Sequence, residues 1–205
     1  TGRDEFGAFL PIIFKSFGDY KPGVYVYLTV PSVAIFGLTE FAVRFPSALF
    51  GALAVIGIYL LTNLLFPKKS LGIRNSTFDI GVIAAAMVAI MPWHLHFSRG
   101  GWEVNVFVTQ IIFATYFLLL SLSTPSSSPP YEGGDRVGVS PLISLALFVL
   151  SIFTYQAGKL LAPLIIFMIL ALNWPIARER FGEIKKNKFH LSIGIILLCI
   201  AFIYF

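Results

Sequence analysis

The chain alternates between long apolar runs and short polar breaks. Residues 45–66 form an apolar run that ends at Pro67-Lys68-Lys69. A transmembrane helix needs about 20 apolar residues to cross roughly 30 Å of hydrocarbon, and this run supplies them. It is therefore predicted to be a membrane-spanning helix.

Two further apolar stretches are too long for single spans. As continuous helices, residues 78–123 would extend about 69 Å and residues 141–174 about 51 Å, at ~1.5 Å per residue. The first stretch is broken by proline, histidine, arginine, glycine and glutamate at 92–103. The second is broken by the polar segment 154–159 and by Pro163 soon after. Each is predicted to fold back and cross the membrane twice.

The expected fold is an all-α polytopic transmembrane protein with about six spans, because residues 191–205 begin one more. The last span ends within an apolar run, and the chain opens on Thr1 rather than methionine, so a fragment of a longer protein is expected. The Ser-, Pro- and Gly-rich segment 124–140 is predicted to be a flexible loop.

Lysine and arginine predict the orientation, because short basic loops stay in the cytoplasm. The loops at 68–74 and 175–188 are basic and are placed inside. Four spans separate them, which puts the breaks at 92–103 and 154–159 on the outer face. The apolar stretch 24–36 is too short to cross comfortably and contains Pro31, which suits an interfacial or re-entrant helix.

These assignments divide the chain into two parts. Residues 1–43 are predicted to form an outer loop with that interfacial or re-entrant helix, and residues 44–205 the transmembrane helical bundle.

Composition agrees with this class. Hydrophobic residues make up 57% of the chain and charged residues only 12%, with a mean hydropathy of +0.85, which excludes an ordinary soluble domain. The net charge of +5 is attributed to topology, since no basic stripe typical of a nucleic-acid-binding module is present. The single cysteine, Cys199, has no disulfide partner within the chain.

Three cations stand at the outer ends of apolar segments: Lys21, Arg99 and Lys159. Together they could bind a lipid phosphate, since guanidinium and ammonium groups form charge-assisted hydrogen bonds with phosphate oxygens. The alternative is that each side chain reaches separately for the lipid headgroups.

Glu103 is the best placed acid, because it begins a predicted span and could serve as a general base. Its alternative role is a favourable charge in the first helical turn. His94 and His96 are two residues apart, so they diverge on a helix and share a side only in an extended segment. With Glu103 they could hold a divalent metal, but interfacial aromatic-belt residues explain them better.

Several motifs resemble those of bacterial GT-C glycosyltransferases related to the protein O-mannosyltransferases and the lipid A aminoarabinose transferase. The resemblance is carried by Asp19-Tyr20-Lys21-Pro22 and by the segment from Glu40 to Gly51, which reads EFAVRFPSALFG. Phe97-Ser98-Arg99 with Glu103 is similar to the second outer loop of that family, and the segment from Tyr155 to Pro163 is similar to one of its hairpins.

The resemblance implies a GT-C-type helical bundle with outer juxtamembrane helices. It also implies an inverting transfer of a sugar from a polyprenyl-phosphate donor, on the outer face of the bacterial plasma membrane. The acceptor would be a protein, a lipid or a glycan. Lys21, with Arg99 and Lys159, would bind the donor phosphate and Glu103 would be catalytic. Asp19, Tyr20, His94, His96 and Tyr155 would contact substrate.

In that family the main catalytic aspartate follows the first transmembrane helix. Asp4-Glu5 lies too close to Lys21 to match it, so this aspartate is expected upstream of residue 1. A transporter or flippase for an anionic lipid-linked substrate is the alternative function. The acidic residues on the outer face favour the transferase.

Overall fold

The computed structural model describes residues 6–7, 9–16, 18–67, 79–123 and 130–178. A short antiparallel hairpin of β1 (Ile13–Ser16) and β2 (Asp19–Pro22) precedes the helices. The helices are α1 (Val24–Phe36), α2 (Glu40–Leu65), α3 (Ile80–Ile90), α4 (Pro92–Arg99), α5 (Glu103–Ser123), α6 (Pro130–Thr154) and α7 (Gly158–Leu172).

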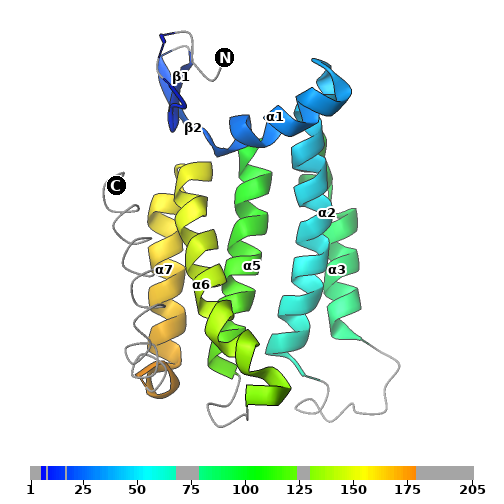
Figure 1. Ribbon diagram of the computed structural model, residues 1–205. Helices are drawn as coiled ribbons and strands as arrows, with labels where there is room; N and C mark the ends of the chain where they lie inside the picture. Colours follow the sequence, from blue (N-terminus) through cyan, green and yellow to red (C-terminus); the bar gives the residue numbers. More distant parts are fainter. Residues whose placement is uncertain (1–5, 8, 17, 68–78, 124–129, 179–205) are drawn as a thin grey trace.

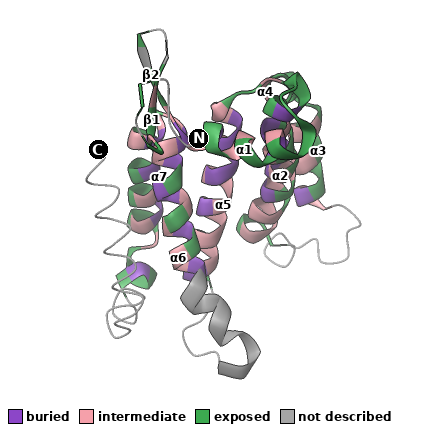
Figure 2. Cartoon of the chain, turned by 45° about the horizontal axis from the view of Figure 1, so that its top comes forward, coloured by how far each residue is buried: buried purple, intermediate pink, exposed green. Residues whose placement is uncertain are grey.

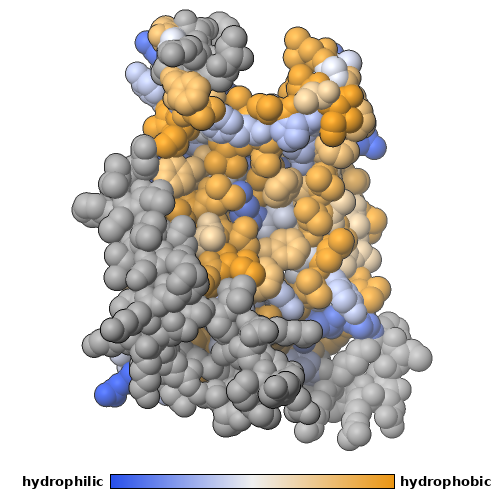
Figure 3. All heavy atoms as spheres, viewed as in Figure 1, coloured by the Kyte–Doolittle hydropathy of each residue, from blue (hydrophilic) through white to orange (hydrophobic). Residues whose placement is uncertain are grey.

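The long helices stand side by side, and α1 lies across their ends beside the hairpin (Figure 1). Within the described ranges, α2 and α5 are each long and apolar enough to cross a membrane. The pair α3 and α4 would make a third span, but it is bent by 59°. Apolar side chains cover most of the visible described surface of the bundle (Figure 3). The predicted all-α transmembrane class is confirmed.

Five of the predicted spans correspond to α2, α3, α5, α6 and α7. The loop predicted at 124–140 is wrong from residue 130 on, because α6 begins at Pro130. The sixth span, residues 191–205, and the basic loop at 68–74 lie outside the described residues, and only residues 175–178 of the second basic loop lie inside them. The division of the chain at residue 44 stays a prediction. In the structure α2 begins at Glu40, where the Thr39 side chain accepts a hydrogen bond from the Ala42 backbone N–H at 3.2 Å.

The fold-back predicted at 92–103 is built around a proline. Pro92 is the first residue of α4, and the residue before a proline is forced toward extended geometry. Met91 accordingly has a ψ of 123°, and it separates α3 from α4. The helix α4 was not anticipated from the sequence, which indicated only a polar break there.

A proline inside α2 also explains how α1 is attached. Pro46 has no N–H, so the Ala42 carbonyl, four residues earlier, lacks its helical donor. The hydroxyl of Ser32 on α1 donates to this carbonyl at 2.6 Å. One residue further on, the Tyr25 hydroxyl donates to the Val43 carbonyl at 2.9 Å. Ser32 and Tyr25 are the two buried residues of α1.

Hydrogen bonds from α4 and α5 continue along the same stretch of α2. Asn105 Nδ2 donates to the Ser47 carbonyl at 2.6 Å, and Thr109 Oγ1 to the Phe50 carbonyl at 2.8 Å. The helices approach closely because Gly51 has no side chain: an added Cβ there would collide with Ser98 Oγ. Small residues and interhelical hydrogen bonds are typical of helix packing in membranes.

The remaining core joins α5, α6 and α7. Phe148, the largest fully buried side chain, packs with Ala114 and Ala162. The Ser144 hydroxyl donates to the Ala114 carbonyl at 2.8 Å. This core holds the start of α7 close to the start of α5.

Candidate active site

Every candidate residue from the sequence lies at one end of the bundle. The hairpin, α1, α4 and the turn between α6 and α7 all gather there, as do the beginnings of α2, α5 and α7 (Figures 1 and 2). Residues far apart in sequence, such as Tyr20 and Gln156, meet at this end. The site is therefore formed by the short elements and the ends of the long helices, rather than by their middles.

Glu103 is the first residue of α5 and is partly exposed. Its charge acts on Tyr25 of α1, the helix that lies across the bundle ends. Burial raises the pKa of Tyr25 to about 12, the negative charge of Glu103 adds to the increase, and a backbone contact with Ser47 opposes it. A carboxylate and a buried phenol thus lie close together at the start of α5.

The two histidines lie in different environments. His94 is buried in α4, and its Nε2 is 3.1 Å from the Gly51 carbonyl oxygen. His96 is exposed and its ring meets the edge of Phe97 at 5.4 Å. Since α4 is helical, a spacing of two sends these side chains in different directions. Among the described residues no three His, Cys, Asp or Glu side chains gather to hold a metal, so the divalent metal considered from the sequence has no ligand set there.

The turn between α6 and α7 carries Tyr155 and Lys159. The Tyr155 ring packs on Phe107 of α5 with centroids 5.5 Å apart. Lys159 is partly exposed and lines a cavity of about 120 Å³ between this turn and the hairpin. The other lining residues are mostly apolar: Ile12, Ile13, Tyr20, Pro22, Ile152, Phe153 and Gln156.

Lys21 lies between two of those lining residues, Tyr20 and Pro22. Successive side chains on a strand point to opposite faces, so Lys21 belongs to the other face of β2. Its side chain is exposed, and Tyr20 is 59% exposed. Asp19 begins the same strand, and its side chain lies outside the described part of the chain.

The three cations therefore share one end of the bundle but not one cavity. Lys159 lines the small cavity beside the hairpin, Lys21 is exposed on the other face of β2, and Arg99 is exposed at the end of α4. Their roles in phosphate binding stay predictions, as do the roles of the other candidate residues.

Two residues at this end were not singled out from the sequence. Tyr25 lies in an apolar stretch of the sequence, which gives no sign that its hydroxyl is buried. Gln156 lies in a polar segment that indicates only a turn. Only the fold reveals their partners, Val43 and Tyr20.

Comparison with known families identifies the chain. The model of the dolichyl-phosphate-mannose-protein mannosyltransferase family matches residues 20–205. The chain belongs to this family. Neither the curated proteins nor the solved structures contain a match. The family resemblance seen in the sequence is confirmed, and this membership means a membrane glycosyltransferase activity of the mannosyltransferase kind, with a lipid-linked sugar donor.

A mannosyltransferase of this family needs room for more than a phosphate, and a second cavity lies at the same end. It measures about 420 Å³ and is lined by Leu38, Thr39, Glu40, Val43, Arg44 and Gly101. Glu40 and Arg44 form an exposed ion pair at 3.2 Å, one helical turn apart. Gly101 lies two residues before Glu103, the first residue of α5.

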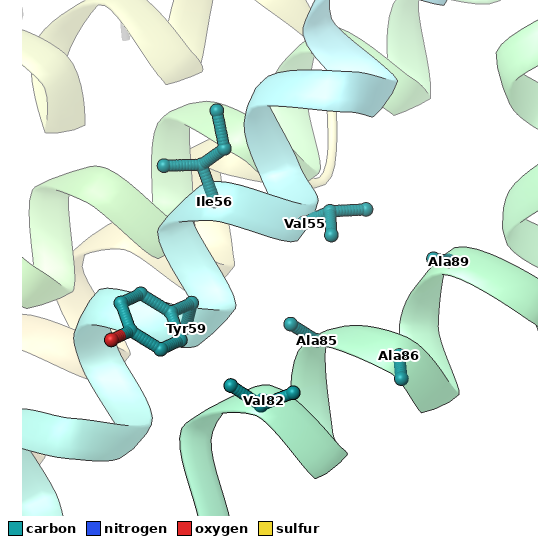
Figure 4. Close-up of a pocket in the computed structure, with 7 residues that line it drawn as sticks. All are labelled: Val55, Ile56, Tyr59, Val82, Ala85, Ala86 and Ala89. Atoms are coloured by element: carbon teal, nitrogen blue, oxygen red, sulfur yellow. The ribbon is translucent and has the colours of Figure 1, made fainter. Parts of the chain in front are cut away.

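A third hollow lies between the middle of α2 and α3. It measures about 320 Å³ and is lined almost entirely by apolar side chains: Val55, Ile56, Val82, Ala85, Ala86 and Ala89, with Tyr59 (Figure 4). Small alanines on α3 leave the space open. It is wide open to the surface and carries no chemistry for sugar transfer.

Proposed function

We propose that this mannosyltransferase-family protein transfers a sugar from a polyprenyl-phosphate donor to an acceptor on the outer face of a bacterial plasma membrane. The observation that carries the proposal is the family match over residues 20–205. The placement of Lys21, Arg99, Lys159 and Glu103 at one end of an apolar bundle supports it.

The proposed chemistry moves one proton and exchanges one bond. A carboxylate takes the proton from the acceptor hydroxyl, and the hydroxyl oxygen attacks the anomeric carbon with inversion. The bond between that carbon and the phosphate oxygen breaks, and the lipid phosphate leaves with the electron pair. Positive side chains stabilise the charge that develops on the leaving phosphate.

Within this scheme Lys159 is the cation best placed for a lipid phosphate. Its cavity has apolar walls from β1, β2 and α6, which suit the isoprenyl carbon next to the phosphate. Lys21 approaches from the hairpin and Arg99 from α4. Glu103 is a catalytic candidate two residues after Gly101, which lines the larger cavity.

The test uses the full-length protein and a radiolabelled polyprenyl-phosphate sugar. Lys21→Ala should lower kcat/KM for the donor about 10- to 100-fold, because hydrogen bonds to charged groups contribute ~1.5–3 kcal/mol. Arg178→Ala is the control, because Arg178 is an exposed cation beyond the C-terminal end of α7, away from the hairpin. It should leave turnover unchanged. Equal turnover by wild type and Lys21→Ala would reject the phosphate role.

A further inference from the structure

Gln156 makes a contact that no sequence motif suggested. Its side-chain Nε2 donates a hydrogen bond to the backbone carbonyl of Tyr20 at 2.8 Å, across 136 positions of the chain. It joins the turn between α6 and α7 to the hairpin. Gln156 and Tyr20 also line the small cavity that holds Lys159.

The hairpin has a second attachment, at its base. The Tyr27 hydroxyl of α1 donates to the Pro11 carbonyl at 2.8 Å, and its ring packs on Phe14 with centroids 5.9 Å apart. The Gly23 N–H donates to the Ile12 carbonyl at 2.7 Å. These contacts fix where the hairpin meets α1. Between β2 and the α6–α7 turn lie the Gln156 hydrogen bond and the mostly apolar lining of the small cavity.

The acceptor of the Gln156 hydrogen bond is informative. The Tyr20 carbonyl belongs to the same planar peptide unit as the Lys21 N–H. A hydrogen bond that holds the Tyr20 carbonyl therefore also holds the peptide plane that precedes the Lys21 Cα, and with it the direction of the Lys21 side chain. We propose that Gln156 is a positioning residue, which holds β2 so that Lys21 meets the donor phosphate. This rests on the proposed function, in which Lys21 binds that phosphate.

The chemistry of the side chain suits the role. A glutamine amide donates N–H to a carbonyl, whereas an ionised glutamate of the same length only accepts. Gln156→Glu therefore removes the hydrogen bond with little change in volume. It also adds a negative charge to the cavity that Lys159 lines. Gln156→Ala removes the hydrogen bond without adding charge.

The kinetic test measures donor KM and kcat separately in the full-length protein. Gln156→Ala should raise the donor KM about three- to tenfold, the range expected for one ordinary hydrogen bond, with kcat nearly unchanged. Gln156→Glu should raise it further. Asn173→Ala is the matched control, because Asn173 Nδ2 also donates to a backbone carbonyl, that of Ile169 at 2.9 Å, toward the far end of α7.

A double mutant separates positioning from a general loss of structure. In a Lys21→Ala background the Gln156→Ala change should have little further effect on KM, because the two residues act through one contact. If Gln156→Ala costs as much with Lys21 absent as with Lys21 present, the inference is overturned.

A distance measurement tests the geometry without any activity. Spin labels are attached at Lys15→Cys on the hairpin and Leu160→Cys on α7, where Leu160 is 73% exposed, with Cys199→Ser removing the native thiol. Gln156→Ala should broaden the distance distribution between the labels, and Asn173→Ala should not. An unchanged distribution overturns the inference even if the protein is a glycosyltransferase. If the distribution broadens but the donor KM is unchanged, Gln156 positions the hairpin but Lys21 does not bind the donor phosphate. That result rejects the phosphate role of Lys21, and the inference with it.

Discussion

The attachment of α1 to the proline in α2 can be tested by removing one hydroxyl. Ser32 is buried, and its hydroxyl donates to the Ala42 carbonyl at 2.6 Å. The helical donor to that carbonyl would be the amide of residue 46, which is a proline and has no N–H. Ser32→Ala should therefore strand a buried carbonyl without a strong donor.

The expected cost follows from that situation. A buried polar group left without its partner costs about 1–3 kcal/mol, so Ser32→Ala should lower the free energy of unfolding by that amount. Pro46→Ala restores an N–H at residue 46, which can donate to Ala42 in the normal helical way. In this background Ser32→Ala should cost less than about 0.5 kcal/mol, because the carbonyl keeps a donor.

The assay is unfolding of the purified full-length protein in mixed micelles with a rising fraction of denaturing detergent. All four members of the cycle are compared: wild type, the two single variants and the double variant. Ser144→Ala is the control, because its hydroxyl donates to Ala114 in the middle of α5, where the helical donor is intact. If Ser32→Ala costs the same with Pro46 as without it, the explanation of how α1 is held is wrong.

Two further predictions concern pH and topology. Because burial raises the pKa of Tyr25 from its usual value near 10 to about 12, the fold favours the neutral phenol, and the free energy of unfolding should fall as the pH rises from about 10 toward 12. Unfolding measured from pH 9 to 12 should show this decrease in wild type, and Tyr25→Phe should flatten it; an equal decrease in both proteins contradicts the assignment. Reporters inserted beside Gly100 and beside Gly182, the latter in the basic segment 175–188, should report opposite sides of the membrane. Finding them on the same side would refute the orientation.

The spans could be predicted from the sequence because apolar length is sufficient to identify them. The run at 45–66 lies within α2, the stretch 78–123 became the three helices α3, α4 and α5, and the stretch 141–174 became the end of α6 followed by α7. The proline at position 92 indicated correctly where the chain turns. Hydrophobic patterning works here because a helix that crosses a bilayer must satisfy its own backbone and present apolar side chains to lipid.

The short elements could not be predicted in the same way. No strong turn signal was recognised between β1 and β2. The structure shows that Gly18 has a positive φ of +87° in their turn. The helix α4 carries histidines and an arginine, so it read as a polar break. His94 shows the consequence for the site, because a residue expected to contact substrate is buried against the Gly51 carbonyl.

Contacts between distant segments were the least predictable part of the site. Nothing within the turn at 155–157 indicates that Gln156 reaches Tyr20, because that pairing depends on the packing of α6 beside α1 and α5. Likewise, the sequence grouped Lys21, Arg99 and Lys159 by their predicted membrane side. It carries no information on which of them face a common cavity, which is decided by strand pleat and helix rotation.

The hydrogen bonds along α2 have a consequence for how this protein can diverge. Between Ala42 and Gly51, side chains of the neighbouring helices form hydrogen bonds with backbone carbonyl oxygens of α2. Every amino acid has the same backbone carbonyl. Exposed positions such as Ala48 and Leu49 can therefore change to other apolar residues without loss of these hydrogen bonds. The donors on the partner helices and the buried small residues of α2, such as Gly51, have no such freedom, so substitutions should accumulate at the exposed positions of α2 and be rare at the donors.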